Sequence, residues 1–152
     1  MRRFVLLVLL LGLAACTAEM QGHRRADTPM QALVGFDAAR FAGVWHEVAA
    51  IGRQPGARWQ VSVLPDGRLR IETGQDGVGT GRMIAPGRMK VDSFAAPLWV
   101  LWADGDMRSV VFGTPDGRFA ILLDRAREMP PDRLRAAREI LAWNGYDLGA
   151  LR

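Results

Sequence analysis

Side chains that could carry out chemistry are few in this sequence. Its 152 residues include one cysteine, Cys16, and two histidines, His23 and His46. A single cysteine permits neither an intrachain disulfide nor a Cys-based zinc site. The serines lack the Gly-X-Ser-X-Gly setting of a nucleophile, and most carboxylates lie at turns, where Asp is favoured by turn geometry. We therefore expect a protein that is not an enzyme, holds no metal and needs no cofactor.

Cys16 itself stands where a different chemistry is indicated. Two arginines precede an apolar run from Phe4 to Leu13, which is shorter than the roughly 20 residues that span a membrane. The run ends in Leu13-Ala14-Ala15-Cys16, which resembles the bacterial lipobox: small residues suit cleavage before Cys16, and the thiol accepts acyl chains such as palmitate. The pattern predicts a lipoprotein signal peptide over 1–15 and a lipid anchor at Cys16. A plain secretion signal that happens to contain a cysteine is the alternative.

The residues after Cys16 predict a location and a tether. Thr17 follows the cysteine, in place of the Asp that usually marks inner-membrane retention in enteric bacteria. We expect an outer-membrane lipoprotein of a Gram-negative bacterium that faces the periplasm. Residues 16–35 are polar and lack an apolar period, which is typical of a flexible tether. Arg24 and Arg25 could also contact anionic headgroups.

The charge balance argues against nucleic acid as a partner. The formal net charge is +4, but loss of the signal peptide with its two arginines lowers the basic residues from 20 to 18, against 16 acidic ones. The remaining arginines are spread along the chain and form no basic run interleaved with aromatics. These charges are therefore interpreted as solvated surface.

From Phe36 onward the sequence consists of short runs of Val, Ile, Leu and aromatics separated by Pro-Gly and Asp-Gly turns, which is typical of hairpins. Links this tight favour antiparallel neighbours, and closing an eight-stranded meander removes its unpaired edges. A closed barrel of eight strands is wide enough for side chains or one small ligand. An open two-sheet sandwich remains the alternative. Strands are predicted over 43–51, 58–64, 68–73, 80–85, 88–94, 98–103, 107–113 and 118–124.

The last segment has a helical period. Pro130 and Pro131 suit a helix start, and Asn144-Gly145 suits a stop. Apolar residues between them share one face. We predict a helix over 132–143 that packs on the outside of the sheet. The predicted fold is all-β: an eight-stranded antiparallel up-and-down barrel with a C-terminal helix, occupying 36–152.

Two segments resemble the lipocalin family. Phe36 to Ala49 contains Gly43-Val44-Trp45, like the Gly-X-Trp motif that opens the family's first strand, and an acidic residue two places after the Trp is similar to the bacterial lipocalin and apolipoprotein D branch. Pro97 to Tyr146, with a strand ending in Arg125 and then a helix, resembles the same branch from its sixth strand to its C-terminus. The resemblance implies a lipocalin barrel.

It also implies roles for particular residues. In the family the Trp plugs the closed end of the barrel and the Arg lies across its ring, so Gly43, Trp45 and Arg125 are expected to close the barrel. Glu47 shares a strand face with Trp45 and Ala49 by alternation. If that face lines the lumen, Glu47 needs a partner or has a raised pKa; a glutamate at the rim is the alternative.

The remaining pocket candidates come from a later strand. Trp99 and Leu101 alternate with Trp102, so only one of the two tryptophans can face inward, and we predict Trp99. The ligand-pocket candidates are therefore Glu47, Ala49, Trp99 and Leu101. The link 52–57 is shorter than the family's first loop, which overhangs the barrel mouth.

Two functions follow as hypotheses. The first is a carrier that binds a small apolar ligand, such as a fatty acid or lysophospholipid, and is attached to the membrane through its N-terminal lipid. The second is a filled barrel that serves the envelope as a structural or interaction module. Counting the large and small side chains that face inward should discriminate between them.

Overall fold

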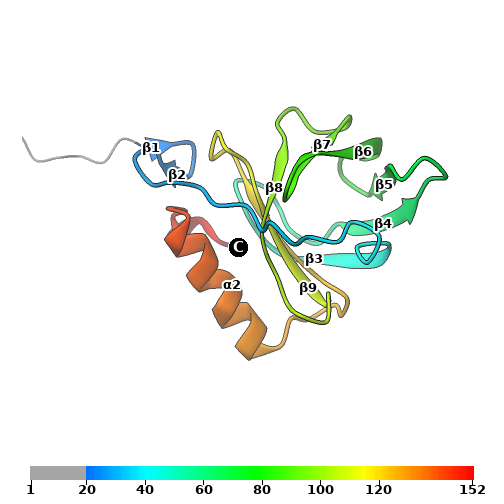
Figure 1. The fold of residues 1–152 in the computed structure, drawn as a ribbon. Helices are drawn as coiled ribbons and strands as arrows, with labels where there is room; N and C mark the ends of the chain where they lie inside the picture. The colour runs from blue at the N-terminus through cyan, green and yellow to red at the C-terminus, as the bar shows by residue number, and fades with distance from the viewer. Residues whose placement is uncertain (1–19) are drawn as a thin grey trace, which may run out of the picture.

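A computed structural model describes residues 20–152, in which eight antiparallel strands close into a barrel (Figure 1). Closure is made by β10, which pairs with β3. The predicted barrel is confirmed, and the open sandwich is wrong. The signal peptide and Cys16 lie outside the described residues. The barrel strands are β3 (Gly43–Ile51), β4 (Arg58–Val63), β5 (Leu69–Thr73), β6 (Gly77–Ala85), β7 (Arg88–Val91), β8 (Leu98–Ala103), β9 (Ser109–Gly113) and β10 (Ala120–Asp124).

The turns form where the sequence predicts them. Gly67 and Gly87 have φ angles of 81° and 64°, in the left-handed region that favours glycine. One strand starts earlier than expected: Gly77, assigned to a link, pairs with Thr73 and opens β6. The sequence does not predict this pairing, because glycine is unfavourable in strands and weakens their pattern, although its backbone can still pair.

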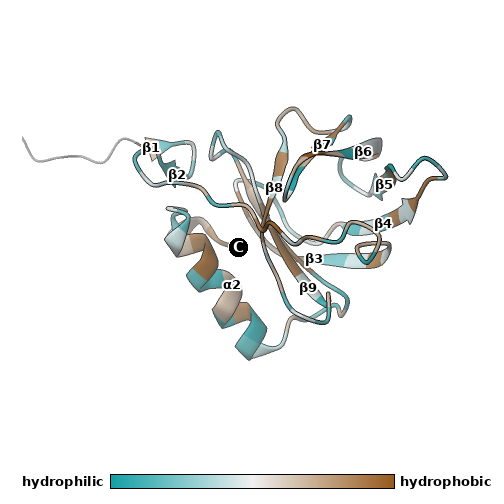
Figure 2. Ribbon diagram, viewed as in Figure 1, coloured by the Kyte–Doolittle hydropathy of each residue, from teal (hydrophilic) through white to brown (hydrophobic). Residues whose placement is uncertain are grey.

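The barrel wall has a hydrophobic cluster on each face. The inner cluster fills the lumen, and the outer one packs beneath helix α2 (Pro131–Trp143), whose Ala137 and Leu141 are fully buried. Figure 2 shows hydrophobic residues along the barrel strands and alternating character along α2. The predicted helix is confirmed. It begins near the end of β10 and is followed by the short 3-10 helix η1 (Leu148–Ala150).

The segment before the barrel is fixed to it. Strands β1 (Met20–Gln21) and β2 (Arg24–Arg25) form a hairpin beside the end of α2 (Figure 1). His23 N donates to Gly117 O at 2.7 Å, and Leu33 N donates to Val100 O at 2.7 Å. Residues 20–33, which the sequence predicted to be part of a flexible tether, are instead held against the barrel by such contacts. Many of these contacts use backbone groups, which composition does not reveal.

Candidate functional site

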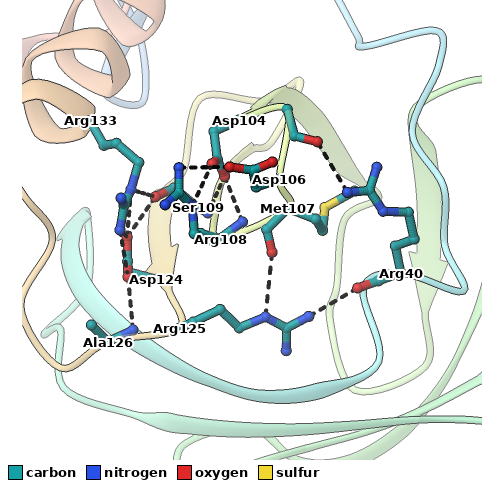
Figure 3. A network of polar contacts seen from close by, with 11 residues as sticks. Arg40, Asp104, Asp106, Met107, Arg108, Ser109, Asp124, Arg125, Ala126 and Arg133 are labelled. Atoms are coloured by element: carbon teal, nitrogen blue, oxygen red, sulfur yellow. Dashed lines mark hydrogen bonds and ion pairs between the residues drawn. The ribbon is translucent and has the colours of Figure 1, made fainter.

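The closed end of the barrel is sealed by a tryptophan and an arginine. Trp45 is fully buried, and the guanidinium carbon of Arg125 lies 3.7 Å from its ring centroid. The same guanidinium donates from Nη2 to Arg40 O at 2.9 Å and from Nη1 to Val44 O at 3.1 Å. Figure 3 shows Arg125 reaching from the end of β10 toward Arg40 and Met107. Arg125 thereby joins three segments across the base.

Gly43 completes this closure. Its φ is 111°, and a Cβ built on it would lie 2.7 Å from Arg125 Nη1. A side chain here would push the guanidinium off the indole ring. The structure thus brings together the three predicted barrel-closing residues, Gly43, Trp45 and Arg125.

Aromatic rings fill the lumen above this base. Trp59 stacks on Phe112 with a centroid distance of 6.1 Å and an interplanar angle of 8°, and Phe41 meets Phe112 edge-on at 5.5 Å. All three residues are fully buried. Large side chains therefore dominate this part of the lumen. The buried strand residues of the inner cluster are Trp45, Trp59, Val61, Leu69, Ile71, Met89, Val91, Leu98, Val100, Val110, Phe112, Ile121 and Leu123.

The opposite end, the mouth, is closed by an ionic cluster that we call the mouth cluster: Glu47, Arg53 and Asp76. Arg53 comes from the β3–β4 link, and its Nη2 lies 2.8 Å from Asp76 Oδ2. Its Nε lies 3.1 Å from Glu47 Oε1, an ion pair without hydrogen-bond geometry. Trp59 Nε1 donates to Glu47 Oε2 at 3.2 Å. The Arg53 side chain is only 9% exposed, so the guanidinium lies in the opening.

Glu47 faces the lumen and has partners, as its position in an apolar strand required. Burial raises the pKa of Glu47 above its ordinary value of 4.5, even though Arg53 and the hydrogen bond from Trp59 lower it. The nearby Asp76 also raises it. Because burial disfavours the charged form more than its partners favour it, this carboxyl group gains a proton more easily than one in water.

Loop aromatics complete the plug. Phe94, from the β7–β8 link, is 4% exposed and lies 5.7 Å from the Trp59 ring. Phe119, just before β10, lies 5.9 Å from Phe94. The Arg53 guanidinium lies 5.9 Å and 5.6 Å from the centroids of these two rings. Side chains from links thus help to fill the mouth half, beside strand residues such as Trp59.

The wall beside this plug has glycines in place of side chains. Gly79 and Gly81 of β6 pair with inward-facing residues of β5. A Cβ on Gly79 would lie 2.7 Å from Ser93 Oγ, and one on Gly81 3.1 Å from Ile71 Cδ1. Ser93 Oγ is buried and has no hydrogen-bond partner. The β7–β8 link therefore occupies space that β6 leaves free.

Ala49 does not line the lumen. In the pairing with β10, Leu123 faces Glu47 while the adjacent Leu122 faces Ala49, which leaves Val48 as an extra residue in β3. This bulge reverses the alternation, so Ala49 joins the outer cluster under α2. The prediction from simple alternation is wrong at this position.

Trp99 and Leu101 also face outward. The pairing of β8 with β9 shifts between Val100 and Trp102, so that Leu101 is the extra residue. As a result Trp99 and Trp102 both lie on the outer side, in the cluster that includes α2. The Arg88 guanidinium stacks on Trp99, with its carbon 3.9 Å from the centroid of the Trp99 ring. The prediction that one of these tryptophans lines the lumen is wrong, because a bulge places both on one face.

The mouth cluster was missed apart from Glu47. A signal for Arg53 was present in the sequence: a lumen carboxylate needs a cation, and Arg53 follows two residues after the end of its strand. Asp76 and Phe94 gave no comparable signal, because both lie in links whose path the sequence does not define.

A second polar cluster joins α2 to the barrel (Figure 3). Asp124 is fully buried; its Oδ2 accepts from Ser109 Oγ at 2.5 Å and from Arg133 Nη2 at 2.9 Å. Arg133 Nε also donates to Ser109 Oγ at 2.6 Å. The Ser109 hydroxyl is held between a carboxylate and a guanidinium, and no imidazole is among these contacts. We interpret the cluster as an attachment of the helix to the barrel.

Neither a metal-ion site nor a membrane-spanning helix is found among the residues that the structure describes. Across 20–152, no three His, Cys, Asp or Glu side chains gather as a metal-ion site would require. Within the same range, every helix falls short of the length and apolarity needed to cross a membrane.

Comparison with known structures agrees with this architecture. Apocrustacyanin C1 matches with a TM-score of 0.61 at 17% identity, covering 82% of this chain and 88% of that one. Apocrustacyanin C2 matches at 0.59 and 17% (76% and 77% covered), and the siderocalin Ex-FABP at 0.59 and 18% (74% and 91% covered). The fold is a lipocalin fold.

Sequence comparison points in the same direction. Temperature-induced lipocalin-1 of Arabidopsis thaliana is 24% identical over 149 residues, covering 80% of each chain. No protein-family model matches the chain. This chain thus adopts a lipocalin fold although its sequence identity to its structural neighbours is low. In this chain an arginine closes each end of the barrel.

Proposed function

We propose that the protein is an envelope lipocalin that binds one small apolar ligand, such as a fatty acid or lysophospholipid, in the mouth half of its barrel. It belongs to the bacterial lipocalin and apolipoprotein D branch of the family, and an acylated Cys16 holds it at the outer membrane on the periplasmic side. The binding role is non-enzymatic.

The observation that carries this proposal is the origin of the side chains that fill the mouth half. Phe94, Phe119 and Arg53 lie just outside or at the ends of the strands. The β7–β8 link can swing outward without breaking the strand ladders, so Phe94 can give way to a ligand. An acyl chain that replaces this ring regains the apolar contact, at about 0.8 kcal/mol per buried methylene.

The fold comparisons support a binding role by analogy. The siderocalin Ex-FABP, one of the structural neighbours, is described as functioning through dual ligand specificities. Fold alone does not define function, so the proposal rests on the mouth and not on this neighbour.

The filled barrel is a second candidate, and a specific observation favours it. Trp59 and Phe41 both contact Phe112 in the lumen, and the three residues come from strands or from the base. Such rings cannot withdraw without opening the barrel. If the mouth plug is equally fixed, the protein serves as a structural or interaction module of the envelope without a ligand.

A titration of delipidated protein with a fluorescent long-chain fatty acid separates the two functions. The carrier predicts saturable binding at one site per protein, with a change in the emission of Trp59, which lies beside Phe94. Absence of binding by any long-chain fatty acid or lysophospholipid would overturn the carrier and favour the filled barrel.

Anchoring is tested separately. Cys16→Ser should release the protein from membranes, because the acyl chains on Cys16 are the proposed membrane anchor and the rest of the polypeptide provides none. A Ser variant that is processed and remains membrane-bound to the same extent would show that Cys16 is not the anchor.

A further inference from the structure

The first residue that the structure describes, Met20, lies in a corner of the molecule at the mouth end of the barrel. The hairpin β1–β2 begins at Met20, and its His23 borders a cleft of about 310 Å³ together with Gly52 and Arg53 of the mouth. Asp147 N, just after α2, donates to His23 O at 2.9 Å. The helix therefore ends, and the hairpin begins, at the end of the barrel that Arg53 closes.

The hairpin is held rigidly against this corner. Arg24 is 4% exposed; its Nε donates to Asn144 O at 2.7 Å and its Nη2 donates to Thr28 O. Arg25 N donates to Gly145 O at 3.0 Å. A Cβ on Gly22 would lie 2.6 Å from Gly117 O, so the hairpin turn packs directly on the β9–β10 turn. The position of Met20 is thus fixed relative to the barrel.

The chain between the anchor and this corner is short. Four residue steps separate Cys16 from Met20, and a fully extended chain covers about 14 Å in that number of steps. A domain of this size has a radius of gyration of about 14 Å. An anchor on so short a connection keeps the corner that contains Met20 within about 14 Å of the membrane.

The same corner exposes side chains that suit a lipid surface. Trp143, the last residue of α2, is 70% exposed, and Met20 is 47% exposed. Met20 shares a shallow groove with Arg25 and Ala142, the neighbour of Trp143. Tryptophan and arginine are the residues that settle at the headgroup level of a bilayer. The acidic residue of the groove, Asp147, is turned to accept from Gly149 N.

We propose that the mouth end of the barrel faces the membrane, with the corner formed by β1–β2 and the last turn of α2 seated in the lipid headgroups and Trp143 in contact with them. This inference rests on the proposed acylation of Cys16. It places the Arg53 plug next to the bilayer, so that an apolar ligand exchanges between lipid and lumen over a short path.

The test uses the full-length lipidated protein, extracted from bacterial membranes and reconstituted into vesicles of phosphatidylethanolamine and phosphatidylglycerol. Trp143→Cys and Val63→Cys each introduce one reactive thiol, since Cys16 is the chain's single native cysteine. Val63, at the closed end of β4, is 45% exposed and serves as the matched control. Each thiol carries an environment-sensitive fluorophore, and the vesicles contain brominated phospholipid as a quencher.

The expected result is a blue shift and loss of emission at position 143, with little change at position 63. Equal quenching at both positions, or stronger quenching at 63, would overturn the proposed orientation. Vesicle retention is measured in parallel with Cys16→Ser. Protein that is retained through Cys16 but keeps the label at 143 in water contradicts the orientation alone. Protein that is not retained contradicts the anchor and, with it, the orientation.

Discussion

At the scale of single residues, two arginines determine how this barrel ends. Arg125 covers Trp45 at the base, and Arg53 covers Phe94 and Phe119 at the mouth. A guanidinium suits both positions because it is flat, stacks on rings and still offers its edge to carbonyl or carboxylate oxygens. Burial lowers the pKa of Arg125, which nevertheless stays charged at neutral pH.

The contact at the base can be measured with a double-mutant cycle. Trp45→Ala should lower the free energy of unfolding by roughly 3–5 kcal/mol, the usual cost of removing a buried aromatic ring. Arg125→Ala should cost less, and the two changes should be coupled in urea unfolding because the groups touch. Strictly additive effects would contradict the contact. Arg127→Ala, at an exposed position two residues later, is the control and should change little.

The mouth cluster should give the protein a pH-dependent stability. Because the pKa of Glu47 is raised in the folded protein, the folded state binds this proton more tightly than the unfolded chain does. The resulting stabilisation is fully present below the ordinary value of 4.5 and is lost as pH rises through the raised value. Glu47→Gln should remove this decline, measured as the difference in unfolding free energy between wild type and variant across that window.

The control for this measurement is Glu72→Gln. Glu72 pairs with Arg70 on the outer face of β5, and both side chains are about half exposed. This variant should follow the wild type at each pH. If Glu47→Gln also follows the wild type throughout, the proposed effect of burial on Glu47 is wrong.

At the scale of elements, helix α2 is attached by one buried ion pair as well as by its apolar stripe. Asp124 of β10 binds Arg133 of the first turns of α2 and Ser109 of β9. These three elements therefore meet at one carboxylate, which fixes the height of the helix along the barrel.

Removing that carboxylate should be costly. Asp124→Ala leaves Arg133, only 15% exposed, without its partner, and breaking a buried pair in this way costs about 3–5 kcal/mol. Asp132→Ala is the matched control, since Asp132 is an exposed acid in the first turn of the same helix and should cost at most about 1 kcal/mol. Chemical unfolding that finds equal costs for the two variants would refute the anchoring role.

At the scale of the whole molecule, side chains that stabilise this small barrel occupy the lumen, which is the space that a carrier needs for its ligand. Phe94 fills the mouth half from a link, whereas Phe112 reaches into the lumen from strand β9 and contacts Phe41 and Trp59. The two positions should therefore respond differently to loss of a ring.

Phe94→Ala should lower the unfolding free energy by roughly 3–5 kcal/mol and at the same time strengthen fatty-acid binding, because the ligand no longer has to displace the ring. Phe112→Ala should be similarly destabilising without a gain in affinity, because the space that it leaves is bordered by Phe41 and Trp59, which a ligand would still have to displace. The checks are urea unfolding and the fatty-acid titration. Reduced binding in Phe94→Ala would contradict the role of Phe94 as a displaceable plug.

The sequence by itself indicated eight antiparallel strands in meander order and an outer helix, and its resemblance to lipocalins favoured a closed barrel over an open sandwich. Turn residues such as Asp66-Gly67 and the run of short apolar segments are local signals, and a meander of eight such segments has one economical way to hide its edges. The closed end was also predicted, because the resemblance to lipocalins implied barrel-closing roles for Gly43, Trp45 and Arg125.

Only the tertiary structure decided which residues face the lumen and what fills it. Single-residue bulges at Val48 and Leu101 interrupt simple alternation, so that Ala49 faces outward and Trp99 and Trp102 share the outer face. A bulge leaves no mark in composition, because it depends on how two strands register across the sheet. The burial of Arg53 and the docking of the segment from Met20 onward likewise arise from contacts between parts of the chain far apart in sequence.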